Sequence, residues 1–146
     1  MKAIPYLFFY GACAEALAFY RDAIGAKIHA LVRFRDMPGA SPDAGDRVMH
    51  AEFRVGESTI FASDGQGGER QRSGYAISLL VADDVEAERL FAALAANGRI
   101  DVPLMSTPFA SRFGMLSDRY GTPWMITTPQ MAMGDQQKPG ARPARA

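Results

Sequence analysis

Apolar and polar residues follow one another along this chain in a pattern that predicts two series of elements in the same order. The first series starts with an unbroken apolar run at 4–10, which is typical of a strand buried on both faces. Apolar residues then recur at helical spacing over 13–23, and Gly25 supplies a helix stop. The alternation over 27–35 indicates a half-buried strand whose even-numbered residues share one face. Further strands are predicted at 47–55 and 58–63.

A polar, glycine-rich connector at 64–74 separates this series from a second one. The second series opens with a strand at 75–81. A helix follows at 85–98, for which Asp83 or Asp84 can serve as N-cap. Three more strands are predicted at 99–106, 112–118 and 123–128. Both series therefore have the order β-α-β-β-β.

Short stretches of letters repeat together with the element order. EALAFY at 15–20 matches EAERLF at 86–91, and VGESTI at 55–60 matches YGTPWM at 120–125. Each pair falls at the same place in its series. The repeat is longer than the roughly 20–50 residues of solenoid repeats, so the pattern indicates a duplicated module and not an array.

The composition is typical of one soluble globular domain. The chain has 146 residues, and an ordered domain at 1–128 falls within the usual size range. Sixteen basic residues balance sixteen acidic ones, so net charge attracts neither nucleic acid nor an anionic membrane. No apolar stretch approaches the roughly 20 residues that a membrane-spanning helix requires. The segment 129–146 loses periodicity and gains Pro, Gly and Ala, which predicts a flexible tail.

Cys13 is the only cysteine, which excludes an internal disulfide and favours a reducing compartment. We therefore expect a cytoplasmic protein. Cys13 stands near the start of a predicted helix, where the macrodipole favours a thiolate and hence a nucleophile. Cysteine is also common as a small buried residue, and no partner base is evident nearby. Both interpretations stay open.

Several motifs carry a resemblance to a known superfamily: PYLFF at 5–9, GACAEALAFY at 11–20, VMHAEF at 48–53, the Ser63-Asp64 pair and RFGMLSDRYGTPWM at 112–125. With the duplicated order, they resemble the vicinal-oxygen-chelate superfamily of glyoxalases, bleomycin-resistance proteins and dioxygenases, and within it the PhnB-like branch. The resemblance implies an α+β fold of two tandem βαβββ modules, at 4–63 and 75–128. It also implies that curved, mainly antiparallel mixed sheets form a cup, and that the protein is a homodimer.

The metal ligands of that superfamily are missing. The resemblance places ligands at Pro5, Ile60, Ala76 and Met125. A divalent ion needs imidazole, carboxylate or thiolate, and these four residues offer at most a weak thioether. We therefore expect neither a metal nor another cofactor. Nothing in the sequence resembles a cofactor fingerprint for methyl transfer, which is named for some relatives.

His50 and Glu52 are the candidates for chemistry. They lie two apart on a predicted strand, so both side chains face the same way. An imidazole and a carboxylate together bind metal or transfer protons, and Asp64 could add a third ligand. The alternative is the polar face of a half-buried strand, because Arg54 continues the same face.

The cup implied by the resemblance gives a set of candidate ligand contacts, and the aromatic residues near the N-terminus are expected in the core and the cup lining. Arg112 could pair with an anionic ligand or with an acidic residue. The candidate ligand-binding residues are Leu7, Phe9, Ser63, Asp64, Ser78, Arg112, Trp124 and Met125.

The favoured function is a metal-independent protein that binds or sequesters a small, partly apolar molecule. One alternative is a lyase, isomerase or dioxygenase with a relocated metal site at His50 and Glu52, or with no metal. Another is an oligomeric interaction protein, because one scaffold hosts many functions.

Overall fold

The computed structural model describes residues 1–129 and contains two compact units, each built from a four-stranded mixed sheet and one helix. The boundary between the units lies between Gln71 and Arg72, within the connector expected at 64–74. The α+β class with two βαβββ modules is confirmed. The flexible tail predicted from 129 onward lies, apart from its first residue, outside the described residues.

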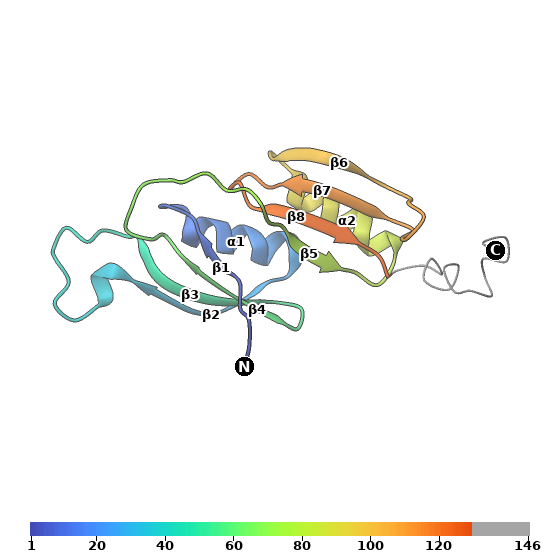
Figure 1. The fold of residues 1–146 in the computed structure, drawn as a ribbon. Helices are drawn as coiled ribbons and strands as arrows, with labels where there is room; N and C mark the ends of the chain where they lie inside the picture. The colour runs from blue at the N-terminus through green and yellow to red at the C-terminus, as the bar shows by residue number, and fades with distance from the viewer. Residues whose placement is uncertain (130–146) are drawn as a thin grey trace, which may run out of the picture. The chain divides into compact units, whose positions relative to one another are not determined.

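The first unit contains all elements up to the connector (Figure 1). Its sheet has the strand order β1-β4-β3-β2, in which β1 runs parallel to β4 and the other neighbours are antiparallel. The elements are β1 (Tyr6–Phe8), α1 (Cys13–Ile24), β2 (Lys27–Arg33), the 3₁₀ turn η1 (Phe34–Asp36), β3 (Val48–Val55) and β4 (Ser58–Ser63).

The second unit repeats this topology with the order β5-β8-β7-β6, in which only β5 and β8 are parallel. The same backbone hydrogen bond closes both sheets: Phe9 N–H donates to the Ser63 carbonyl, and Val81 N–H donates to the Thr127 carbonyl, each at 2.9 Å. The elements are β5 (Ile77–Leu80), α2 (Asp84–Ala95), β6 (Arg99–Met105), β7 (Phe113–Ser117) and β8 (Pro123–Thr127).

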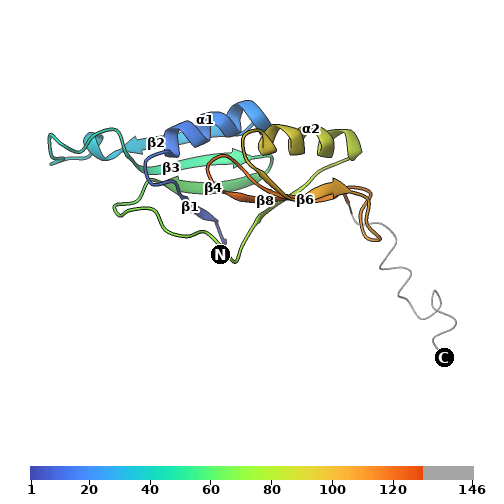
Figure 2. The ribbon, with the colours of Figure 1, turned by 90° about the horizontal axis from the view of Figure 1, so that it is seen from above.

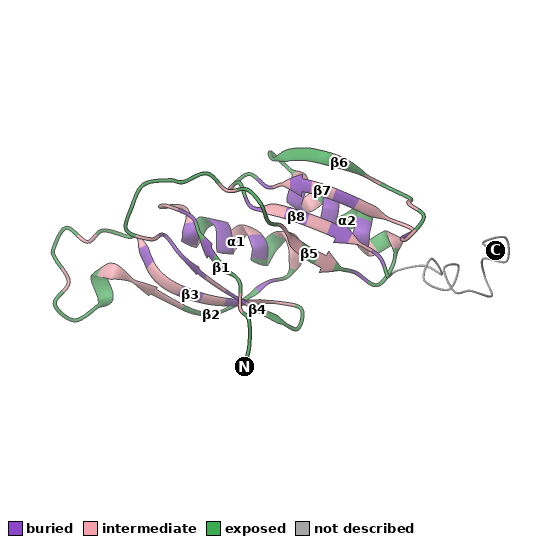
Figure 3. Ribbon diagram, viewed as in Figure 1, coloured by how far each residue is buried: buried purple, intermediate pink, exposed green. Residues whose placement is uncertain are grey.

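In each unit the helix covers one face of its own sheet, and the core lies between them (Figures 1 and 2). In the first unit the Tyr20 ring of α1 stacks on Phe53 of β3, with ring centroids 5.9 Å apart. In the second unit α2 buries Leu90 and Leu94. Figure 3 shows buried residues on both helices and the central strands, whereas β6 is largely exposed. The other face of each sheet is therefore free of its helix.

Two strand predictions were wrong about burial. The run at 4–10 was expected to be buried on both faces, but only Leu7 of β1 is buried, while Tyr6 and Phe8 are 40% and 43% exposed. The reason is that α1 covers a single face of the sheet. Strand β2 was expected to be half-buried, yet Lys27 to Ala30 are exposed because β2 is the edge strand. A register shift between Ile28 and Ala30 also interrupts the even-numbered face.

The helix ends follow local signals. The Asp83 side chain is the N-cap of α2 and accepts a hydrogen bond from Glu86 N–H at 2.9 Å, as the sequence suggested. Gly25 ends α1 in the left-handed conformation, with φ 73°. Helix α2 ends at Ala95, three residues earlier than expected. No helix among residues 1–129 has the length and apolar character needed to cross a membrane.

Candidate functional site

The face of the first sheet opposite α1 carries a group of rings that we call the aromatic face: Tyr6, Phe8, His50 and Phe61. Strands β1, β4 and β3 bring them together, since Tyr6 is paired with Phe61 and Phe61 with Glu52, two residues from His50. Tyr6 stacks on Phe8 at 5.0 Å between centroids, and His50 meets Phe61 edge-on at 5.0 Å. Such arrangements are the favoured ones for aromatic pairs, so the rings support one another while remaining accessible.

A hydrogen bond joins two members of the aromatic face. The Tyr6 hydroxyl lies 2.8 Å from His50 Nδ1. Partial burial raises the pKa of the Tyr6 phenol above its ordinary value of 10.0, so it keeps its proton near neutrality. A protonated phenol can donate to Nδ1, which leaves Nε2–H as the outward donor of a neutral imidazole. The pair therefore offers a defined polar group beside apolar rings.

Tyr10 lies next to the aromatic face and has a strained backbone. Its φ is 53°, a value that non-glycine residues seldom adopt, and its ring centroid lies 6.5 Å from that of Phe8. Such a conformation costs on the order of 1–3 kcal/mol and persists where the surrounding structure demands it. Strained residues cluster at functional sites, which is consistent with a binding role here.

Ser63 and Asp64, two candidate ligand contacts, are buried at the end of β4 and bind the backbone. Asp64 Oδ1 accepts hydrogen bonds from the N–H groups of Gly11 (2.6 Å) and Cys13 (2.9 Å), and Oδ2 accepts one from Val48 N–H (2.7 Å). Helix α1 has no side-chain cap of its own at Ala12, so Asp64 supplies it from a distant strand. Both oxygens are committed, so Asp64 does not provide a third ligand beside His50 and Glu52.

Cys13 is fully buried at the start of α1. Burial raises the pKa of its thiol to about 12, and the negative charge of Asp64 adds to the effect. The thiol form therefore persists despite the helix macrodipole, because desolvation and a neighbouring carboxylate both oppose ionisation. The nucleophile interpretation loses its physical basis, and the buried-residue interpretation describes this side chain.

The donor set does not fit a catalytic metal ion. Within residues 1–129 no group of three or more His, Cys, Asp or Glu side chains is placed to hold one. His50 and Glu52 share a face of β3, but a catalytic zinc usually has three protein ligands.

The other candidate contacts fall into two groups. Leu7, Phe9 and Trp124 are buried in the cores of their units, and Trp124 Nε1 donates to Asp118 at 2.8 Å. Their role as ligand contacts stays a prediction that this placement does not favour. Ser78 and Met125 instead lie side by side in the register of the second sheet, on the face away from α2. They remain accessible to a ligand.

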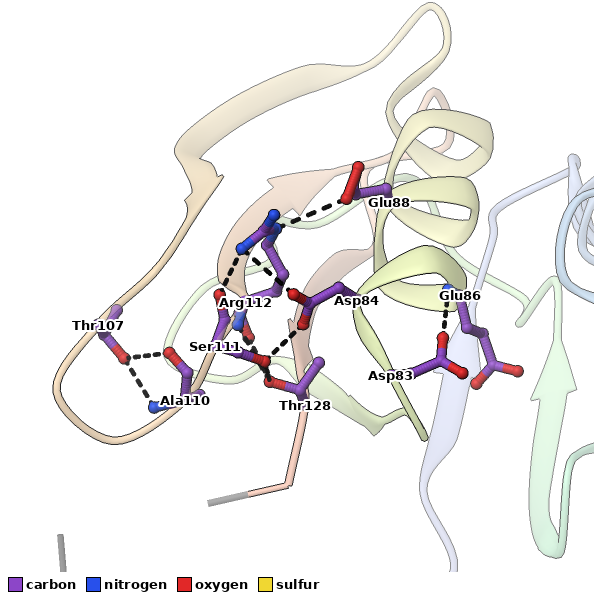
Figure 4. A network of polar contacts seen from close by, with 9 residues as sticks. All are labelled: Asp83, Asp84, Glu86, Glu88, Thr107, Ala110, Ser111, Arg112 and Thr128. Carbon is purple, nitrogen blue, oxygen red and sulfur yellow. Dashed lines mark hydrogen bonds and ion pairs between the residues drawn. The ribbon is translucent and has the colours of Figure 1, made fainter. Parts of the chain in front are cut away.

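Arg112 belongs to a polar network at the start of α2 (Figure 4). Its guanidinium lies 3.5 Å from Asp84 and 3.6 Å from Glu88, and it also donates to the Ser111 carbonyl at 2.8 Å. The Ser111 hydroxyl bonds Asp84 in turn. The guanidinium is thus paired with two carboxylates, which favours the interpretation that Arg112 pairs with acidic residues over the one in which it binds an anionic ligand.

Sequence reasoning missed an apolar surface on the second sheet. Leu80 is 70% exposed and Met105 is 44% exposed. Thr127 and Phe113 lie between them across the sheet, since Leu80 is paired with Thr127, Thr127 with Phe113, and Phe113 with Met105. Alternation within β7 and β8 could have indicated two faces, but not which face the helix covers.

Comparisons with known proteins identify the family of this chain. The family model described as 3-demethylubiquinone-9 3-methyltransferase matches residues 1–127. Protein YjdN of Escherichia coli (strain K12) is 33% identical over 138 residues, covering 86% of this chain and 94% of its own.

The chain belongs to this family.

Solved structures agree with the PhnB-like resemblance. Protein PA1353 from Pseudomonas aeruginosa is 39% identical with a TM-score of 0.82, covering 90% of this chain and 99% of its own. A putative 3-demethylubiquinone-9 3-methyltransferase, PhnB protein, from Bacillus cereus is 27% identical with a TM-score of 0.75, covering 88% and 99%. A glyoxylase/bleomycin resistance protein/dioxygenase domain from Frankia (17%, TM-score 0.59, covering 88% and 97%) shares the fold. The PhnB-like resemblance is thereby confirmed, and the chain shares the fold of the glyoxalase and bleomycin-resistance proteins.

Proposed function

We propose that this protein binds a small, planar, partly apolar molecule on its aromatic face without the help of a metal ion. The observation that carries the proposal is the accessible group of Tyr6, Phe8, His50 and Phe61 with its internal hydrogen bond. Exposed apolar groups that lie next to one another commonly mark binding sites. A few polar groups among apolar ones are typical of small-molecule sites.

The chemistry of the face suggests how a ligand would be held. A flat ring can stack on Phe8 and Tyr6, which are the most exposed members. A carbonyl or hydroxyl of the ligand can accept a hydrogen bond from the outward nitrogen of His50. Ser78 and Met125, on the accessible face of the second sheet, remain candidates for further contacts.

Metal independence is supported by the side chains of residues 1–129, among which no three His, Cys, Asp or Glu residues are placed to hold an ion. We do not extend the methyl transfer named in the family description to this chain, because its sequence has no cofactor fingerprint for that reaction. In line with its single cysteine, we place the protein in the cytoplasm, and we expect it to act as a homodimer.

A second candidate function is proton transfer without a metal. It is favoured by the Tyr6–His50 hydrogen bond, since in the other tautomer Nδ1–H donates to the Tyr6 oxygen and the outward Nε2 can serve as general base. Turnover that is abolished in His50→Gln while binding persists would support this candidate over simple binding.

Native mass spectrometry of protein purified without chelators tests the main proposal, because it reports retained ligand, metal and oligomeric state together. A binding assay can use coumarin as a planar probe, followed by NMR of the labelled protein. We expect coumarin to shift the amide signals of β1 and β4, and Phe8→Ala to weaken binding at least tenfold. Ile100→Ala, which trims another exposed apolar side chain on β6, should leave binding unchanged.

Two results would contradict the proposal. The first is one tightly bound divalent ion per chain that is lost in His50→Ala. The second is coumarin binding that is equal in Phe8→Ala and in the unmodified protein.

A further inference from the structure

A depression at one end of the first sheet is lined by positively charged side chains. It has a volume of about 330 Å³ and is lined by Gly25, Lys27, His29, Arg54 and Gly56. Gly25 follows α1, and Gly56 lies in the turn between β3 and β4. The volume lies at the lower end of the range of small-molecule sites. We call this feature the basic depression.

The charges of the basic depression are not neutralised. Lys27 on β2 is paired directly with Arg54 on β3. Like charges in that position repel one another and destabilise a sheet. No ion pair among residues 1–129 involves Lys27, His29 or Arg54.

Arg54 also has a buried donor without a partner. Its Nη2 donates to the Glu57 carbonyl at 2.8 Å, which holds the guanidinium in place. Its Nε is buried and is the one buried side-chain nitrogen or oxygen among the described residues that lacks a hydrogen-bond partner. Buried donors are nearly always satisfied, so this one carries a local cost that a shift of the guanidinium toward a bound anion would remove.

Two features bring negative charge near the basic depression and would weaken anion binding, but the effect of each is limited. The carbonyl end of α1 carries partial negative charge, but the N–H groups of Gly25 and Ala26 already bind the carbonyls of Arg21 and Tyr20. Glu52 lies on the same face of β3 two residues from Arg54, without an ion pair to it.

We propose that the basic depression binds the phosphate group of a small phosphate monoester. A phosphate dianion would match the two fixed charges of Lys27 and Arg54, whereas a single carboxylate would leave one uncompensated. Arginine presents several donors in a planar fork that suits phosphate oxygens, and lysine adds a point charge. His29, in the irregular part of β2, supplies a further N–H donor. The volume leaves space for the organic group of the ester.

This site lies on the same side of the sheet as the aromatic face but at its end. The nearest ring, that of Phe61, is paired with Glu52, two residues from Arg54, whereas His50 lies four residues from Arg54, which at the usual strand rise is about 13 Å. Loss of coumarin binding in Phe8→Ala should therefore leave phosphate binding intact, and the two proposals can fail independently.

The test is an NMR titration of the full-length, isotope-labelled protein with inorganic phosphate and with glycerol 3-phosphate, at constant ionic strength. We expect saturable shifts at the amides of Gly25, Lys27 and Gly56, tighter binding of the ester, and at least tenfold weaker binding in Arg54→Gln. Arg89→Gln removes an exposed charge on α2 and should bind like the unmodified protein. Vesicles with phosphatidic acid form a separate arm, in which Arg54-dependent binding would identify a lipid headgroup as the source of the phosphate.

Lys27→Gln keeps the proposal testable if Arg54→Gln does not fold. In phosphate-free buffer this variant should melt at the same or a higher temperature than the unmodified protein, because the repulsion between residue 27 and Arg54 is removed. Added phosphate should raise its melting temperature by less than that of the unmodified protein. Equal shifts with sodium chloride alone, shifts centred elsewhere, or unchanged binding in both variants would overturn the proposal.

Discussion

Replacing Asp64 by alanine is expected to destabilise the first unit strongly. The substitution removes the acceptor of three backbone N–H groups, those of Gly11, Cys13 and Val48, in a site that is 1% exposed. A buried donor left unsatisfied costs about 1–3 kcal/mol. Because water can replace the acceptor of Gly11 N–H in its loop, we expect the free energy of unfolding to fall by roughly 3–5 kcal/mol in total. That is a large part of the 5–15 kcal/mol by which domains are usually stable.

Urea unfolding followed by far-UV circular dichroism measures this loss. The sole tryptophan, Trp124, is buried in the second unit, so its fluorescence reports that unit separately. Asp64→Asn, which retains one carbonyl oxygen, should fall between the unmodified protein and Asp64→Ala. The control is Asp83→Ala, which removes an exposed cap with one hydrogen bond and should cost about 1 kcal/mol. A loss below about 1 kcal/mol in Asp64→Ala would refute the view that this carboxylate joins α1 to β3 and β4.

Three further predictions concern other parts of the fold. The pKa of the Cys13 thiol is raised to about 12 in the folded protein, whereas its ordinary pKa is 9.0. Between these pH values the folded protein keeps a thiol proton that the unfolded chain loses. Stability should therefore fall as pH rises from about 9 toward 12 by more than in Cys13→Ala, as measured by urea midpoints across that range. Arg112→Gln should lower the free energy of unfolding by only about 1 kcal/mol, because its ion pairs with Asp84 and Glu88 are partly exposed. A double-mutant cycle with Asp84→Asn measures the coupling, and a coupling well above that value would contradict the prediction. Gly114→Ala should destabilise by about 1–3 kcal/mol in thermal melts, because its Cβ would lie 2.7 Å from the Phe91 ring, and an unchanged melting temperature would contradict that packing.

The sequence determined the elements and their order, because the signals for these are local. Periodicity located both helices and every strand, with errors of a few residues at the ends. Asp83 begins α2 through its capping side chain, and Gly25 ends α1 through its left-handed backbone, both as predicted. The duplicated motifs also indicated the family and two units of the same topology. These features depend on neighbouring residues, which the sequence displays directly.

The tertiary structure alone decided which residues face a ligand. Tyr6 and His50 are 44 residues apart, and only the β1-β4-β3 register brings them within a hydrogen bond. The same register turned Asp64 into the cap of a helix 51 residues away, and burial there kept Cys13 protonated in place of activating it. Alternation shows that a strand has two faces, but the helix that covers one of them is positioned by packing between distant segments. For that reason Leu7 became core and its neighbour Tyr6 became surface.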